Sequence, residues 1–227
     1  MAEGRTIAVG DIHGCLAALR AVLEAISPRS DDTIITLGDY VDRGPESRGV
    51  LDELIAIRSR CRLIPLLGNH DEMFLEICSG QADLFDQWLP FGGDATVASY
   101  SGRVPEEVPK AHLEFLRACR SSYETQRHLF VHASYVAHLP LRRQPVEVLH
   151  WESLNIRQPG PHCSGKTAIV GHTAQKDGEV LDLGYLKCID TCCYGEGWLT
   201  ALDVESGQLW QADKIGRLRK QEGSRRD

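Results

Sequence analysis

The chain has 227 residues, of which 42% are hydrophobic, which is ordinary for one globular domain with a substantial buried core. Its net charge of -7 gives no overall field that would hold nucleic acid, so we expect no nucleic-acid partner. The sequence does not open on a cationic region followed by an apolar stretch, and no segment approaches about 20 continuous apolar residues, so we expect a cytoplasmic protein with no membrane association.

The first seventy residues predict two strand-loop-helix units, which place successive strands in parallel. The expected helices follow helical spacing of apolar residues, and Pro45 suits the first turn of the second. The expected elements are a strand at Thr6 to Val9, a helix at Cys15 to Ile26, a strand at Thr33 to Leu37, a helix at Arg48 to Arg60 and a strand at Leu63 to Leu67. Asp71 then stands at the start of another helix, where the unsatisfied amides favour a carboxylate.

The middle of the chain differs in character from what precedes it. Residues 81–120 predict a helical cap, with Trp88, the Gly92-Gly93 pair and Tyr100 in its first part. A helix from Glu106 to Arg120 is expected after Pro105.

The carboxyl half predicts an antiparallel or mixed sheet interrupted by an irregular insert at 137–161. The expected strands are Leu129 to Val131, Thr167 to Val170, Leu186 to Ile189, Trp198 to Asp203 and Gln208 to Gln211. We therefore expect one catalytic domain over residues 1–215 and a polar, basic tail over 216–227, which we interpret as a solvated terminus. The cations of this tail are Arg217, Arg219, Lys220, Arg225 and Arg226.

Five polar motifs each follow a short apolar run, at the carboxyl ends of predicted strands, where open α/β sheets build their sites. They are GDIHG at 10–14, GDYVDRG at 38–44, GNHD at 68–71, His132 after HLFV, and GHT at 171–173. Their Asp, Asn and His side chains mix oxygen and imidazole ligands, which suits Mn, Fe or Zn better than Ca or a sulfur-bound structural Zn. Six ligands are too many for one open catalytic metal, so the motifs predict a two-metal hydrolase.

Taken together, the five motifs resemble the signature series of the phosphoprotein phosphatase family of metallophosphoesterases, in particular its bacterial serine/threonine phosphatases. The order and separations match, and the resemblance covers most of the chain. A single Gly-Asp pair would indicate only a turn, whereas the seven residues of GDYVDRG with four companions are a specific signal. The resemblance implies a four-layer α/β/β/α sandwich with two divalent metals, most readily Mn, between its sheets.

The same resemblance implies a role for each site residue. Asp39 would bridge the two metals, with Asp11 and His13 on the first and Asn69, His132 and His172 on the second. Arg43 would direct two donors at the phosphoryl oxygens, and Asn69 would also contact the substrate. His70 would be the proton donor to the departing oxygen, with Asp42 fixing its tautomer. A second phosphate-binding arginine is not evident from the motifs; Arg157 is our choice, with Arg142 and Arg143 as alternatives.

Two other patterns in the sequence point to different chemistry. Gly160, Gly165, Lys166 and Thr167 match the G-x-x-x-x-G-K-T loop of nucleotide hydrolases, but a β-branched run follows where that loop needs a helix, so we interpret the match as accidental. The eight cysteines lack a framework spacing, and we expect reduced thiols. Cys192 and Cys193 follow GHT in a stretch that resembles the family, so we expect them near the metals.

We therefore expect a metal-dependent phosphatase that acts on phosphoserine or phosphothreonine, with phosphotyrosine as a further substrate, in a protein or peptide. Two alternatives remain at this point: a symmetrical dinucleoside tetraphosphate hydrolase with the same metal centre, and an inactive module that binds phosphoproteins. The sequence does not specify the oligomeric state.

Overall fold

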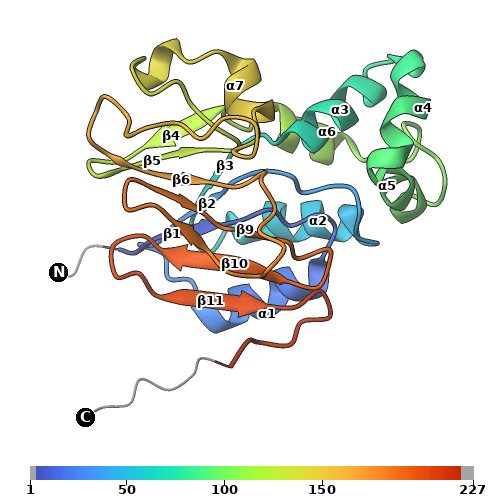
Figure 1. Cartoon of the computed structure of the whole chain (residues 1–227). Helices are drawn as coiled ribbons and strands as arrows, with labels where there is room; N and C mark the ends of the chain where they lie inside the picture. Colours follow the sequence, from blue (N-terminus) through green and yellow to red (C-terminus); the bar gives the residue numbers. More distant parts are fainter. Residues whose placement is uncertain (1–3, 221–227) are drawn as a thin grey trace.

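The computed structural model describes residues 4–220, and Figure 1 shows two β-sheets stacked on each other, with helices on their outer sides. Residues 221–227, which include Arg225 and Arg226 of the predicted tail, lie outside the described residues. Within the described part, no helix is both long and apolar enough to cross a membrane.

The first sheet has the strand order β11-β10-β1-β2-β3, with β9 paired to β10. The three strands expected at the amino end are parallel neighbours, whereas β10 runs antiparallel to β1. The strands are β1 (Thr6–Val9), β2 (Thr33–Thr36), β3 (Arg62–Pro65), β9 (Asp190–Thr191), β10 (Trp198–Asp203) and β11 (Leu209–Ala212).

Helices α1 (Leu16–Ile26) and α2 (Ser47–Ile57) cross over between these parallel strands and cover the outer face of the sheet (Figure 1). Their apolar residues recur at helical spacing, which gives each helix a buried stripe. The prediction placed Pro45 inside the first turn of the second helix. It lies instead in the preceding turn, because α2 begins only at Ser47.

The second sheet has the order β4-β5-β6-β8-β7 and is mixed, as the sequence predicted for this half. Strands β5, β6 and β8 are parallel, and β4 and β7 pair antiparallel at the two edges. The strands are β4 (Ser122–Glu124), β5 (His128–Val131), β6 (Thr167–Val170), β7 (Leu181–Asp182) and β8 (Leu186–Cys188). The insert expected to be irregular contains the turn η3 (Leu141–Arg143) and helix α7 (Val146–Trp151).

Alternate side chains of the strands enter three separate apolar layers, because successive residues of a strand point to opposite faces. Ile7 and Val9 pack toward α1 and α2, whereas Ala8 packs between the sheets with Phe130 and Ile169. On the far face of the second sheet, Leu129 and Val131 belong to the layer that includes Leu149 of α7. Helices, sheet, sheet and helix therefore stack in that order, and the predicted four-layer sandwich is confirmed.

Short helices occupy the region expected to form a cap, and Figure 1 shows them gathered at one end of the molecule. They are α3 (Asn69–Cys78), η1 (Ala82–Leu84), α4 (Phe85–Trp88), η2 (Leu89–Phe91), α5 (Gly93–Ser99) and α6 (Lys110–Arg117). Helix α6 begins four residues later than predicted, after Pro109 rather than Pro105. Residues 85–99 come after α3 in the chain and are hydrogen-bonded to the loop that follows β2.

Candidate metal centre

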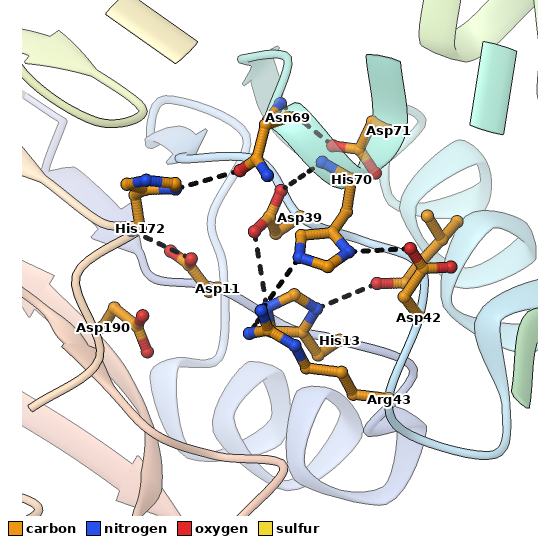
Figure 2. A network of polar contacts seen from close by, with 12 residues as sticks. Asp11, His13, Asp39, Asp42, Arg43, Asn69, His70, Asp71, His172 and Asp190 are labelled. Carbon is orange, nitrogen blue, oxygen red and sulfur yellow. Dashed lines mark hydrogen bonds and ion pairs between the residues drawn. The ribbon is translucent and has the colours of Figure 1, made fainter. Parts of the chain in front are cut away.

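The loops that follow β1, β2, β3, β5 and β6 bring the expected polar residues together, and Figure 2 labels all of them except His132. This convergence follows from the topology, since the carboxyl ends of parallel strands meet at one edge of a sheet. All of these side chains are buried except those of Arg43 and His172, which are half-buried. The residues are Asp11, His13, Asp39, Asp42, Arg43, Asn69, His70, His132 and His172.

The backbone at this edge is unusual, because several site residues have a left-handed conformation that non-glycine residues rarely adopt. Positive φ values occur at Asp39 (50°), Asp42 (71°) and Arg43 (70°) in one loop, and at His13 (45°) and His172 (61°) in two others. Each such residue costs about 1 to 3 kcal/mol and persists only where contacts with the surrounding structure offset that cost. The loops after β1 and β2 support each other, because the His13 amide donates to the carbonyl of Asp39 at 2.7 Å.

One group of acceptor atoms is formed by Asn69, His132 and His172. His132 Nδ1 donates to the carbonyl of Leu37 at 2.8 Å, and His172 Nε2 donates to the carbonyl of Trp151 at 3.1 Å. The second nitrogen of each ring therefore carries a lone pair. Both lone pairs face the Asn69 side-chain oxygen, at 3.0 Å from His132 Nε2 and 2.9 Å from His172 Nδ1. Three electron-rich atoms without a proton between them fit a cation.

The other group lies around His13 and Asp39. His13 donates from Nδ1 to the Val41 carbonyl at 2.9 Å, which leaves Nε2 as an acceptor, 3.4 Å from Asp39 Oδ2. The second oxygen of Asp39, Oδ1, lies 3.5 Å from His132 Nε2. Asp39 thus presents one oxygen to each group. His13, Asp39 and His70 on one side, and Asp39, His132 and His172 on the other, are spaced closely enough to hold an ion each.

Burial makes these groups suitable ligands at neutral pH. It lowers the pKa of His13 and His172, and it lowers that of His132 to about 3, so the imidazoles are neutral. Burial also raises the pKa of Asp11, as do the neighbouring charges of Asp190 and Asp39.

Two carboxylate oxygens, Asp11 Oδ1 and Asp190 Oδ2, are buried with no hydrogen-bond partner. Burial raises the pKa of Asp190 to about 6, and the negative charge of Asp39 contributes. Crowded carboxylates beside neutral imidazoles are the donor set that a pair of divalent cations would neutralise. The residues present therefore fit two such ions.

Arg43 lies between His13, which the sequence predicted as a metal ligand, and His70, which it predicted as the proton donor. Its guanidinium donates to His13 Nε2 at 2.7 Å and to His70 Nε2 at 2.9 Å, and it lies 4.4 Å from the centre of the Tyr194 ring. A cation held by His13 needs the lone pair that Arg43 occupies. Ion binding at His13 therefore competes with this bond and would free one arm of the guanidinium. The second arm would be freed when His70 Nε2 carries a proton and no longer accepts, and both arms would then be available for an anion.

His70 and Asp42 form a buried pair with a 2.7 Å bond from Nδ1 to Asp42 Oδ2. Two donors from the cap region complete the contacts of this carboxylate: Trp88 Nε1 at 2.8 Å on Oδ2 and the Thr96 hydroxyl at 2.7 Å on Oδ1. The sequence analysis assigned no site role to Trp88 or Thr96. The only hint was the Gly92-Gly93 pair between them, where a Cβ at Gly93 would lie 2.4 Å from the Trp88 ring.

Asp71 and Asp190 are two further buried acids at this edge that the sequence analysis left without a site role. As expected, Asp71 lies in the first turn of α3, where it accepts the amide of Gly68 at 3.0 Å. It also accepts the amide of Tyr40 at 2.9 Å and so connects the loops after β2 and β3. Asp190, in β9, accepts the Cys192 amide at 3.1 Å. Cys192 thus lies two residues after Asp190 and is bonded to it through its amide.

The structure does not bring Arg157 to these residues. Its side chain is exposed and bonds to Glu152 at 2.6 Å on the loop after α7. Arg142 and Arg143 are exposed in η3. The contact that this insert makes with the centre comes from a backbone group instead, the Trp151 carbonyl that accepts His172.

The two competing sequence patterns have ordinary structural explanations. Thr167 opens strand β6 rather than a helix, and Lys166 pairs with Glu124 at 2.6 Å, so the G-x-x-x-x-G-K-T match has no phosphate-binding geometry. All eight cysteines are free thiols, as predicted.

Comparisons with known proteins agree with this geometry. The sequence profile of the calcineurin-like phosphoesterase family matches residues 4–180. A symmetrical bis(5'-nucleosyl)-tetraphosphatase of Burkholderia pseudomallei is 40% identical over 74 residues. That match covers 33% of this chain and only 26% of the relative.

Two solved structures share the fold at low sequence identity. A candidate diadenosine tetraphosphatase superposes with a TM-score of 0.70 and 23% identity, over 92% of this chain and 93% of its own. A cold-active protein-tyrosine phosphatase of a psychrophilic Shewanella superposes with a TM-score of 0.69 and 15% identity, over 96% of this chain and 80% of its own.

Proposed function

Because this chain belongs to the calcineurin-like phosphoesterase family, which hydrolyses phosphoesters with divalent metal ions, we propose that it is a phosphatase acting on phosphoserine and phosphothreonine in proteins. The observation that carries the proposal is the placement of His70. One ring nitrogen bonds to the buried Asp42 carboxylate and the other accepts from Arg43, within the group of metal-binding atoms that includes His13 and Asp39.

A serine or threonine alkoxide is strongly basic and needs a proton as its bond to phosphorus breaks, whereas a nucleotide leaves as a much weaker base. A histidine oriented by a buried carboxylate is suited to supplying that proton. The arrangement therefore favours alkyl phosphates over phosphoanhydrides as substrates.

The residues divide the reaction between them. Arg43 would hold two phosphoryl oxygens through its fork of donors. As a water oxygen bonds to phosphorus, one of its protons passes to solvent and the other stays on the product phosphate, while the phosphorus-oxygen bond to the substrate breaks with its electron pair remaining on the departing oxygen. His70 Nε2 protonates that oxygen, and the Asp42 carboxylate stabilises the imidazolium before the transfer.

The metal ions supply charge neutralisation and an acidified water when bound. Asp11, His13 and Asp39 would hold the first, and Asp39, Asn69, His132 and His172 the second. This mixture of oxygen and imidazole donors suits Mn, with Fe and Zn as the other candidates. Asn69 would also contact the substrate, because its amide borders the same space.

The test compares two leaving groups in His70→Asn. We expect kcat on a phosphoserine peptide to fall by about 10² to 10⁴ and on p-nitrophenyl phosphate by distinctly less, since p-nitrophenolate departs without a proton. Metal content, measured by elemental analysis, should not change. Equal losses on both substrates with both ions bound would remove the general-acid role.

A symmetrical dinucleoside tetraphosphate hydrolase is the second candidate, because the Burkholderia relative named above has that activity and 40% identity over its matched segment. Diadenosine tetraphosphate and a phosphoserine peptide should be assayed side by side with Mn. Faster turnover of the dinucleotide, with ADP as the only nucleotide product, would favour this candidate over the first. No turnover of either substrate, together with binding of the phosphopeptide, would indicate an inactive phosphoprotein-binding module.

A further inference from the structure

The carboxylate of Asp42 receives its hydrogen bonds from parts of the chain that are far apart in sequence. It is fully buried, and its donors are His70 of α3, Trp88 of α4 and Thr96 of α5. Trp88 and Thr96 are themselves 1% and 0% exposed. Neither side chain reaches solvent, so water cannot replace them as donors without a change in packing.

The direction of each bond in this network follows from chemistry. An ionised carboxylate only accepts and an indole N–H only donates. The Thr96 hydroxyl must therefore donate to Asp42 Oδ1. Its oxygen is then free to accept the Asp42 amide at 2.8 Å. Ser47, 2.9 Å from Thr96, then donates to the same oxygen. Thr96 thus holds both the amide and the carboxylate of Asp42.

This bonding fixes a residue whose backbone is held in an unfavourable conformation. Asp42 has a φ of 71°, which costs about 1 to 3 kcal/mol for a non-glycine residue. Thr96 holds Oδ1 and Trp88 holds Oδ2, so the carboxylate has a single orientation, in which Oδ2 also accepts His70 Nδ1. The plane of the His70 ring follows from that bond.

We propose that Trp88 and Thr96 are positioning residues for proton transfer by His70. They hold Asp42, and Asp42 holds the imidazole so that Nε2 faces the departing oxygen. Neither residue touches the substrate in this role. The inference rests on the general-acid function proposed above, and it gives residues 85–99 a part in the chemistry, in addition to their packing.

The packing role of Trp88 can be separated from its N–H. The indole lies 5.8 Å from the Phe74 ring and 5.9 Å from the Phe85 ring, measured between ring centres. Trp88→Phe keeps an aromatic ring in this cluster and removes the donor. Phe85→Leu is the matched control, because it disturbs the same cluster from a residue that does not bond to Asp42.

We expect Trp88→Phe and Thr96→Val each to lower kcat on a phosphoserine peptide by about 10- to 100-fold, the usual cost of losing an orienting partner. On p-nitrophenyl phosphate the loss should be less than about threefold, because that substrate does not need the proton. Thr96→Ser restores the hydroxyl and should restore most of the activity on the peptide. Phe85→Leu should change both substrates alike. Equal losses on both substrates in Trp88→Phe and Thr96→Val would overturn the proposal.

A double-mutant cycle decides whether Trp88 acts through His70. In a His70→Asn background, adding Trp88→Phe should cost less than about threefold on the peptide, because the function it supports is already absent. A full 10- to 100-fold further loss would show that Trp88 acts by another route and would overturn the inference. If His70→Asn loses equal activity on both substrates, the general-acid function fails. If His70→Asn loses more on the peptide, as expected, but Trp88→Phe keeps wild-type activity, only the positioning role fails.

Discussion

Asp39→Asn tests whether one carboxylate serves two ions. Asp39 is the residue whose two oxygens face different histidines, Oδ2 at 3.4 Å from His13 Nε2 and Oδ1 at 3.5 Å from His132 Nε2. The substitution keeps the size of the side chain and removes one negative charge. The bridging hypothesis predicts that both ions weaken together.

The expected size follows from charge interaction and linkage. An ion at 100 times its Kd stabilises the folded state by about 2.7 kcal/mol, so two ions contribute about 5 kcal/mol. For a chain of this length that raises Tm by about 10 to 20 °C. Loss of a unit charge about 4 Å from a divalent ion, at an effective dielectric of about 20, costs about 8 kcal/mol, or roughly 10⁶ in affinity for each ion. At the same metal concentration the variant should show almost no metal-dependent rise in Tm.

The metal-free protein should respond in the opposite direction. Burial is the main cause of the raised pKa of Asp11, Asp71 and Asp190, and the charge of Asp39 adds to it, so removal of that charge relieves repulsion. Metal-free Asp39→Asn should therefore melt at the wild-type temperature or above it.

The assay is differential scanning calorimetry of metal-free protein with increasing Mn, combined with elemental analysis. Asp203→Asn is the control, because Asp203 is a buried carboxylate at the other end of the first sheet, paired with Ile7 through the sheet register. A variant at Asp39 that binds two ions and keeps the full rise in Tm would refute the bridging argument.

Three other predictions follow from the contacts described. Arg43→Met should tighten Mn binding by the His13 group, measured by calorimetry, because the competing 2.7 Å bond is gone, while kcat falls; weaker binding would contradict the competition. Lys166→Ala should leave phosphatase activity within about threefold and ATP binding undetectable, since Lys166 pairs only with exposed Glu124; micromolar ATP binding lost in the variant would restore a nucleotide loop. Burial alone would raise the pKa of Asp32, but bonds from Arg5 and Arg29 hold it well below its usual range. The ionised Asp32 carboxylate therefore stabilises the fold above a pH of about 3.9, and this stabilisation is lost as the pH falls through the pKa of the folded state. Asp32→Asn should lower the free energy of unfolding, measured with urea, by about 2 to 3 kcal/mol at pH 7 and by progressively less in acid.

The sequence alone was sufficient for the parallel strands and for the polar residues that meet at their carboxyl ends. Thr6–Val9 and Thr33–Thr36 are continuous apolar or β-branched runs. Gly-Asp follows the first at once and the second after Leu37, and this local pattern specifies both a buried strand and the loop at its end. Because parallel topology sends those ends to one edge, neighbours in space could be inferred from residues far apart in the chain. The edge strands β4, β7 and β9 were missed, since two or three residues show no period.

Contacts between side chains were decided only by the tertiary structure. Trp88 and Thr96 meet Asp42 across 46 and 54 residues of chain, and no spacing in the sequence marks a bond closed by the packing of two short helices. Arg157 was expected at the phosphate and instead pairs with Glu152, five residues away, because the α7 insert directs it outward. Local propensity and periodicity specify elements and the loops that end them, whereas the partner of a buried polar group depends on where distant elements pack, which is fixed only when the whole chain folds.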